Sequence, residues 1–300
     1  MSDNRFTLVG MRPVDKQSPQ NTKWYKGKPI FSIVLFLIIV LGCLFCELFI
    51  PQDPTYMDLY NANIAPCKKF WFGTDTMGRD IFSMVWYGGR ISLFIGFFAT
   101  AISTSIAICY GAASGLAPKW LDAIMMRFTE IFLSIPELLL VVLIQAVLGD
   151  ANVISITFVI GITSWVAVAK VVRTEVLQIR NSEYVIAARC MGAGFFHILN
   201  KHLIPNFMSS IMFMVVMNIR TAIVYESTLS FMGIGLSTEI ISWGSLLSLS
   251  ERSLLSGSWW IILIPGIFLI TSLLCITDIG NYLRDRKKDI NGVKRLFCRK

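Results

Sequence analysis

Long apolar runs dominate the pattern of hydrophobic and polar positions along this chain. A membrane-spanning helix needs about 20 mostly apolar residues. Six segments meet this requirement, at residues 30–49, 91–116, 121–148, 153–169, 207–225 and 259–277. The segments between them contain most of the charged residues. The pattern therefore predicts an all-α, polytopic membrane protein with six transmembrane helices.

Composition supports a membrane protein and gives its orientation. The 300 residues are 55% hydrophobic and 15% charged, with a mean hydropathy of +0.64, which is too apolar for an ordinary soluble chain. With a cytoplasmic N-terminus, 21 of the 27 Lys and Arg residues lie in cytoplasmic segments, five lie outside, and Arg220 lies within the fifth span. Basic residues remain on the cytoplasmic side. We therefore expect both termini in the cytoplasm, and the lipid bilayer rather than nucleic acid explains the net charge of +8.

The span assignment divides the chain into a cytoplasmic tail, a membrane domain and a basic cytoplasmic tail, at 1–29, 30–285 and 286–300. Three connections within the membrane domain are too long to be simple turns. Two of these are external and one is cytoplasmic, at 51–89, 229–258 and 171–206. Aromatic residues of the external connections are expected to anchor the protein at the membrane interface. These are Trp71, Phe72, Trp243, Trp259 and Trp260.

Four charged residues within or near the spans are candidates for a translocation pathway or gate. Glu130 and Glu137 stand seven residues apart and are expected on one face of the third span, where Pro136 either kinks the helix or forms part of a gate. An unpaired Arg220 near the bilayer centre costs about 2.5–3.5 kcal/mol or more on insertion scales, so it lines a pathway or pairs with an acid. Glu226 caps its helix, pairs with Arg220, or faces the pathway.

The cytoplasmic loop contains a predicted helix over residues 174–191 that ends at Gly192. Small residues at Ala187 and Ala188 permit close approach, and Gly192 supplies a turn. Positive charge surrounds them at Arg180, Arg189 and Lys201. Two interpretations fit this pattern: a docking surface for soluble machinery, or an amphipathic helix that rests on the membrane.

The same loop resembles a known motif. EYVIAARCMGA at 183–193, followed by HLIPN at 202–206, is similar to the EAA loop of ABC importer permeases of the dipeptide, oligopeptide and nickel family. One position departs, because Ile186 stands where the motif has Glu. Other segments resemble the C-type permease of these systems, and the resemblance covers roughly 31–285. They are WFGTD at 71–75, GRD at 78–80, LSFMGIG at 229–235 and SWG at 242–244.

This resemblance implies a type I ABC importer permease fold with a cytoplasmic coupling helix, in a bacterial or archaeal plasma membrane. The implied partners are a second permease in a heterodimer, two ABC ATPase subunits and an external substrate-binding protein. ATP and Mg would be used by the ATPases, and this chain would bind no cofactor. The residues implied to couple to an ATPase are Glu183, Tyr184, Ala187, Ala188, Gly192, Ala193, His202, Pro205 and Asn206.

The expected cargo is a di- or oligopeptide, with nickel or a metal chelate as the alternative under the same mechanism. An autonomous secondary transporter or channel is less favoured, because no inverted repeat or coupling-ion site is apparent. The sequence has no phosphate-binding Gly-x-x-x-x-Gly-Lys motif and no nucleophile with a matching base. We therefore expect no catalytic residue, and no metal site at His202, which lacks a second ligand at a suitable spacing.

Overall fold

The computed structural model describes residues 29–149, 151–237, 239–249 and 257–297, with side chains omitted at Arg189 and from residue 286 onward. Apart from Pro29, the predicted N-terminal tail lies outside these residues. Within them every regular element is helical, and Thr74 and Asp80 form an isolated β-bridge. The predicted all-α class is confirmed.

The elements follow one another as a series of long and short helices. In chain order they are α1 (Ile30–Leu44), η1 (Cys46–Leu48), η2 (Leu59–Asn61), α2 (Ile81–Leu116), α3 (Lys119–Leu133), α4 (Glu137–Leu148), α5 (Val153–Thr163), α6 (Val166–Ile179), α7 (Glu183–Cys190), α8 (Phe195–Ile198), η3 (Leu199–Leu203), α9 (Ile204–Phe231), α10 (Trp243–Ser248) and α12 (Trp260–Phe297).

Three continuous helices in the described residues are long and apolar enough to cross a membrane, namely Ile81–Leu116, Phe195–Phe231 and Trp260–Asp285. The pairs α3 with α4 and α5 with α6 add two more if each bent pair forms one span. The apolar α1 is shorter, at 15 residues.

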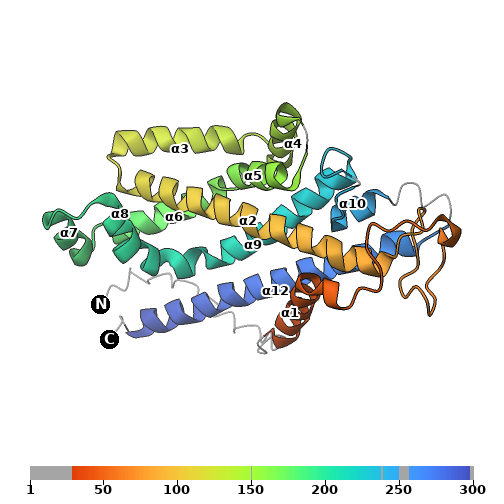
Figure 1. Ribbon diagram of the computed structural model, residues 1–300. Coiled ribbons are helices and arrows are strands. Elements are labelled where there is room, and N and C mark those ends of the chain that lie inside the picture. The colour runs from red at the N-terminus through yellow and green to blue at the C-terminus, as the bar shows by residue number, and fades with distance from the viewer. Residues whose placement is uncertain (1–28, 150, 238, 250–256, 298–300) are drawn as a thin grey trace, which may run out of the picture.

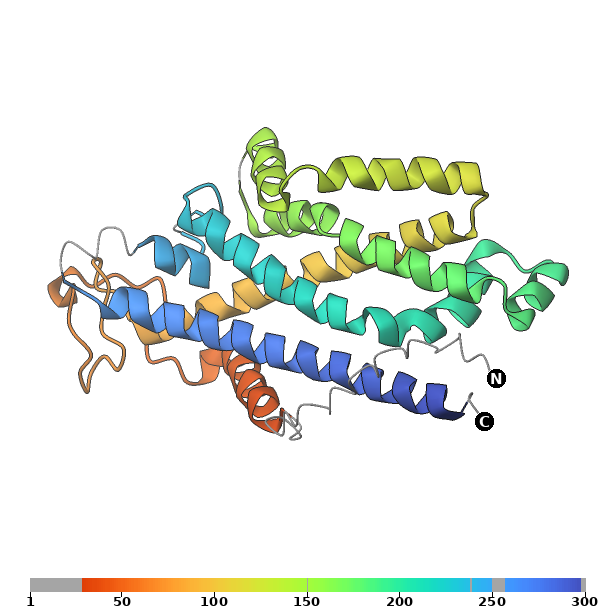
Figure 2. The same ribbon diagram turned by 180° about the vertical axis from the view of Figure 1, so that it is seen from behind.

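The long helices run along the molecule and separate its two ends (Figure 1). Helix α2 packs against α5, α6 and α9, while α12 packs against α9 and α1. The view from behind shows the same arrangement of the long helices (Figure 2). One end carries α7, α8 and the turn between α2 and α3, and the other carries α10 and the segment that precedes α2. The segments predicted for opposite sides of the membrane thus lie at opposite ends.

Glycines bring α2 close to its neighbours, as is common where helices pack in membranes. A Cβ atom added at Gly96 would lie 2.6 Å from the Ile223 side chain, and one at Gly115 would lie 2.7 Å from Val176. An added Cβ at Gly111 would also collide with α6. Any larger residue at these positions would push the helices apart.

Helix α2 begins at Ile81 rather than at residue 91, so the predicted external segment is shorter than expected. Asp80 caps the helix, because its carboxylate accepts bonds from the Ser83 backbone N–H at 3.0 Å and hydroxyl at 2.6 Å. Just before it, the buried Asp75 and Arg79 form an ion pair at 2.7 Å. These local bonds order a stretch whose polarity predicted a loop.

The predicted third span, 121–148, is not one straight helix. Helices α3 and α4 meet at an angle of 85°. Pro136 causes the break, because it lacks a backbone N–H and disfavours a helical conformation at the residue before it. The expectation that Glu130 and Glu137 share one helix face is therefore wrong. The fourth span is also bent, by 42° between α5 and α6.

Two of the predicted interfacial aromatics are instead part of the interior. Trp243 is fully buried and its indole N–H donates to the Val85 carbonyl at 2.9 Å. Trp260 is also buried and donates to the Thr74 carbonyl at 3.0 Å. A buried indole is stable when its N–H finds such an acceptor, and sequence position alone does not reveal that acceptor. Trp71 is exposed, as expected for an interfacial residue.

Candidate coupling and pathway sites

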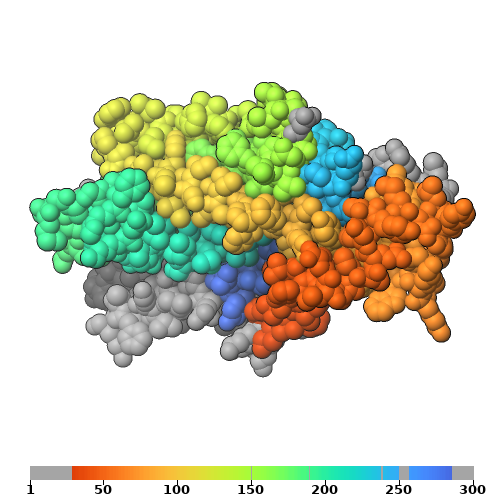
Figure 3. Space-filling model, viewed as in Figure 1, coloured from red at the N-terminus to blue at the C-terminus, as the bar shows by residue number. Residues whose placement is uncertain are grey.

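Helix α7 forms part of the tip of the molecule, where it projects from the helical bundle (Figure 3). It is separated from α6 by residues 180–182, so the single helix expected over 174–191 is in fact two. Ser182 makes the turn, since its hydroxyl donates to the Ile179 carbonyl at 2.7 Å and its own carbonyl accepts from the N–H groups of Val185 and Ile186. Asn and Ser favour turns through such side-chain bonds.

One face of α7 is buried and the other is open. Val185 and Ala188 are buried against the rest of the chain, whereas Glu183 and Ala187 are exposed. The two alanines therefore differ, and only Ala187 is available to a partner. Four large apolar residues of this loop are also exposed: Tyr184 at 45%, Ile186 at 49%, Met191 at 81% and Phe196 at 70%. Ile186, which departs from the expected motif, lies on this open surface.

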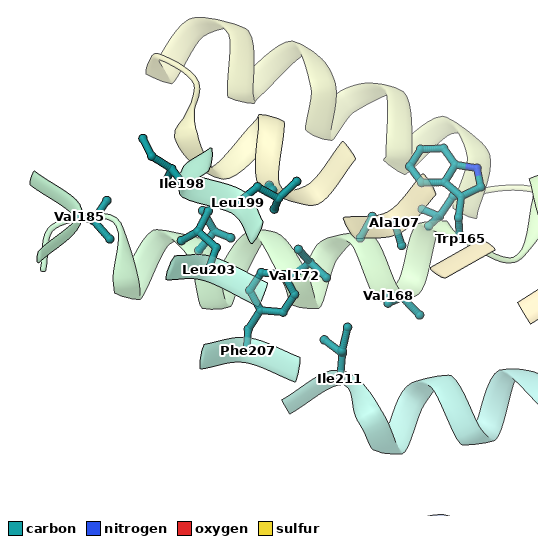
Figure 4. Close-up of a cluster of buried hydrophobic side chains, with 14 residues drawn as sticks. Ala107, Trp165, Val168, Val172, Val185, Ile198, Leu199, Leu203, Phe207 and Ile211 are labelled. Carbon is teal, nitrogen blue, oxygen red and sulfur yellow. The ribbon is translucent and has the colours of Figure 1, made fainter. Parts of the chain in front are cut away.

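A buried apolar cluster joins α7 to the long helices (Figure 4). Val185 belongs to the same cluster as Leu203, Phe207 and Ile211, which lead into and along α9. Val172 of α6 lies in it as well. Because packed interiors transmit displacement rather than absorb it, movement of α7 is expected to move α6 and α9 with it.

Gly192 ends α7 in a left-handed conformation with φ of +81°. The Ala193 N–H donates to the Ala188 carbonyl at 3.0 Å, as in a Schellman cap. An atom added at the Gly192 Cβ position would meet nothing within 4 Å. Backbone conformation rather than space therefore requires glycine here.

The loop returns to the membrane through a continuous helix. Pro205 was expected to precede the span, but it lies in the first turn of α9, and helix extends from Phe195 through the π-turn η3. Proline offers no N–H, and the π-turn directly before it shifts the hydrogen-bond register. The Asn206 side-chain amide donates to the His202 carbonyl at 2.5 Å.

A cavity of about 510 Å³ lies between α7 and the returning helix. His202 faces it, with ring centroids 5.9 Å from Tyr184 and 6.1 Å from His197. His197 was not among the predicted coupling residues, and an isolated exposed histidine gives little signal in sequence. In the described part of the chain, no three His, Cys, Asp or Glu side chains are grouped as metal ligands would be.

Glu226 is fully buried and bonded only to serines among the described residues. Its Oε1 accepts from Ser242 at 2.7 Å and Ser230 at 3.1 Å, and its Oε2 accepts from Ser92 at 2.9 Å and Ser227 at 3.3 Å. These bonds connect α2, α9 and the N-cap of α10. A carboxylate enclosed by its own chain in this way fastens helices together, and does not line an open pathway.

No ion pair among the described residues joins the other three candidate pathway residues to one another. Arg220 is exposed on α9 and belongs to none of the ion pairs found among the described residues, so of its two alternatives the pairing with Glu226 is absent there. Glu130 is exposed and pairs with Arg127 at 2.7 Å. Glu137 begins α4 and accepts a bond from the Tyr225 hydroxyl of α9 at 3.1 Å.

Sequence reasoning missed an ion pair close to the coupling loop. Arg173 of α6 donates to both carboxylate oxygens of Asp122 on α3, each at 2.5 Å. The Ser114 hydroxyl also donates to Asp122, at 2.6 Å. The sequence gives only a weak signal for this pair. It places an acid in the first turn of one helix and an arginine near the same predicted membrane surface, but it does not show that these two helices are neighbours.

Comparison with known proteins decides the family. Residues 107–289 match the family described as binding-protein-dependent transport system inner membrane component. This chain belongs to that family. Over 253 residues the permease is 36% identical to the dipeptide transport system permease protein DppC of Bacillus subtilis (strain 168), covering 84% of this chain and 78% of DppC. It is also 36% identical over 254 residues to the oligopeptide transport system permease protein OppC of the same organism, covering 85% and 83%.

A solved structure supports the fold of the permease. The MetNI methionine ABC transporter, in inward-facing conformations, matches with a TM-score of 0.53 and 17% sequence identity, over 67% of this chain and 95% of the matched chain. At this identity the match concerns the fold alone. The predicted resemblance to peptide-type ABC importer permeases is thus confirmed by the relatives, and the helical importer fold by the structure.

Proposed function

We propose that this permease forms half of the translocation pathway of an ATP-driven importer for di- or oligopeptides. A second permease would form the other half, two ABC ATPases would bind ATP and Mg, and an external binding protein would deliver the cargo. This chain would hold no cofactor of its own. The proposed setting is a bacterial or archaeal plasma membrane, crossed six times by α1, the two bent pairs and the three long helices, with both termini in the cytoplasm.

The open face of α7 is the observation that carries the proposal. Basic residues support a cytoplasmic position for this loop. There, exposed Tyr184, Ile186, Met191 and Phe196 would be costly without a protein partner. Exposed apolar groups around a short helix with a buried anchor at Val185 fit a helix that docks into a groove. A helix resting on lipid would turn its apolar side chains to the membrane, whereas this one projects from the end of the bundle.

The same arrangement supplies a mechanism. ATP favours the closed ATPase dimer, and only such a difference in affinity can shift the population of two transport states. Closure would displace α7, and the cluster around Val185, Leu203 and Phe207 would pass that displacement to α9. Hydrolysis would release the dimer and return the pathway to its inward-facing state. The expected roles of Glu183, Ala187 and His202 at this interface remain part of the proposal.

Purification and reconstitution test the proposed function. A tagged copy extracted from its native membrane should bring with it a second permease and ATPases that contain phosphate-binding Walker motifs. Reconstituted with the binding protein, the complex should transport radiolabelled di- or oligopeptides only when ATP is present on the side of the membrane that carries the ATPases. Radioactive nickel in a parallel assay distinguishes the alternative cargo. A chain that is active alone and insensitive to ATP would refute the importer proposal.

A single substitution tests the docking surface. Ile186→Asp places a charge on the open face of α7 without touching the buried Val185. It should reduce the amount of ATPase that co-purifies, because burying an unpaired carboxylate in an interface is unfavourable. Asn181→Asp adds the same charge to an exposed position in the preceding turn and serves as the control. Equal ATPase recovery from both variants would contradict docking through α7.

A further inference from the structure

The breaks in the two bent spans meet at one small cavity. Its wall includes Ile135 and Glu137 beside the break between α3 and α4, and Thr163 and Ser164 at the end of α5. Helix α9 closes the third side with Asn218 and Thr221. We call this cavity the hinge pocket. Broken helices that meet within a membrane protein commonly expose backbone and polar groups to a ligand.

Two groups of the hinge pocket have hydrogen-bonding capacity to spare, and both can accept. The hydroxyl groups of Thr163 and Thr221 donate to carbonyls of their own helices, at 2.9 Å and 3.1 Å. The Ser164 hydroxyl is buried and has no hydrogen-bond partner among the described residues. Glu137 is the pocket's ionisable side chain, and among the described residues it accepts a bond only from Tyr225. A carboxylate with oxygen lone pairs to spare favours a cationic donor.

The end of α5 and the first turns of α4 and α6 meet at the pocket. Helix α5 ends at Thr163, so its C-terminal carbonyls and their partial negative charge lie at the pocket wall. Asn218 donates its side-chain N–H to the Ser164 carbonyl at 3.3 Å, which holds α9 against this end. Half-helix C-terminal ends of this kind attract cations in transporters, whereas the N-terminal turns of α4 and α6 interact favourably with the Glu137 carboxylate.

The size of the hinge pocket limits the ligand. Its volume is about 100 Å³, which equals the space of about three water molecules in the liquid. Pockets that enclose a whole small-molecule ligand measure about 300 Å³ or more. The hinge pocket therefore admits an end group of a ligand and leaves the remainder outside.

We propose that the hinge pocket binds the protonated amino terminus of a transported peptide, with Glu137 as its counter-ion and Ser164 as a further acceptor. The inference rests on the proposed function, because it requires that peptides pass this chain. An ammonium group has three donors and matches the vacant acceptors in both charge and size. Tyr225 acts as a positioning residue that holds the Glu137 carboxylate toward α9.

Weak binding to the assembled importer tests this proposal without the binding protein, which has its own selectivity. The complex is placed in nanodiscs without nucleotide, and saturation-transfer NMR measures binding of the dipeptide Ala-Ala and of its N-acetylated form. Ala-Ala should bind at least about tenfold more tightly than the acetylated form, because a hydrogen bond to a charged group is lost on acetylation. Glu137→Gln should remove this difference, while Glu47→Gln, at an exposed ion pair with Arg90, should retain it.

The outcomes distinguish failure of the hinge-pocket proposal from failure of the proposed function. Equal binding of the two dipeptides by the wild-type complex, or no binding of either, overturns the proposal without requiring any variant to fold. If Glu137→Gln still binds Ala-Ala more tightly than the acetylated form, the proposed role of that carboxylate is overturned and the cavity holds only water. The proposed function fails separately, if the wild-type complex shows no ATP-dependent peptide uptake.

Discussion

Replacing Glu226 with alanine should destabilise the permease strongly, although this residue is a single acid in a long apolar helix. The substitution removes the acceptor for four hydroxyl groups. Three of these belong to Ser92, Ser230 and Ser242, each with at most 1% of its surface exposed. A buried donor left without a partner costs about 1–3 kcal/mol, so the lower limit gives a total of about 3 kcal/mol.

Thermal unfolding measures this effect. For chains of about this size, 1 kcal/mol corresponds to about 2–4 °C in Tm, so Glu226→Ala should lower the Tm by about 6–12 °C. A fluorescent-protein fusion of this chain, heated in detergent and passed through a size-exclusion column, reports the folded fraction of this subunit alone. Glu130→Gln is the matched control, because its exposed ion pair with Arg127 contributes about 1 kcal/mol or less.

The result also distinguishes a fastening role from a pathway role for Glu226. If Glu226→Ala melts within about 2 °C of Glu130→Gln, the carboxylate does not hold the helices together and the reasoning from its four bonds is refuted. Loss of peptide uptake with an unchanged Tm would instead assign Glu226 to the pathway.

Three further substitutions test other features of the fold. Gly192→Ala should cost about 1–2 kcal/mol at the end of α7 because of its positive φ, and should lower uptake, whereas Gly194→Ala, at φ of −71°, should not. Gly111→Ala should lower the Tm by overpacking α2 against α6, at about 1–3 kcal/mol, while Gly266→Ala, with its nearest neighbour at 3.9 Å, should leave the Tm unchanged or slightly raised. Asp122→Asn should cost about 2 kcal/mol by weakening its charged bonds to α6; a change in Tm no larger than that of an exposed ion pair would contradict this.

Hydropathy predicted where apolar helices occur because that signal depends only on composition over about 20 residues. It did not predict the shape of those helices. Pro136 predicts a kink, but the 85° angle also depends on what α4 packs against. Val141 of α4 and Ile156 of α5 are neighbours only in the folded chain. Likewise, Asp80 extends α2 outward through a local cap that hydropathy does not register.

The sequence predicts a coupling loop, but it does not show which face of that loop is open. The spacing of small residues and glycine resembled a family motif, and relatives confirm the family. Which alanine faces outward depends on how α7 packs against α8, and so only the folded chain distinguishes Ala187 from Ala188. Glu226 shows the same limit, because two of its four serine partners lie 134 residues before it and 16 residues after it.

That last separation has a consequence during synthesis. Ribosomes add about 5–20 residues per second, so Ser242, which follows Glu226 by 16 residues, emerges about 1–3 seconds after it. Glu226 must therefore enter the translocon before Ser242 has left the ribosome. Ser92 on α2 is already available by then. The order of the helices along the gene thus provides the buried carboxylate with a first partner before its last one has emerged.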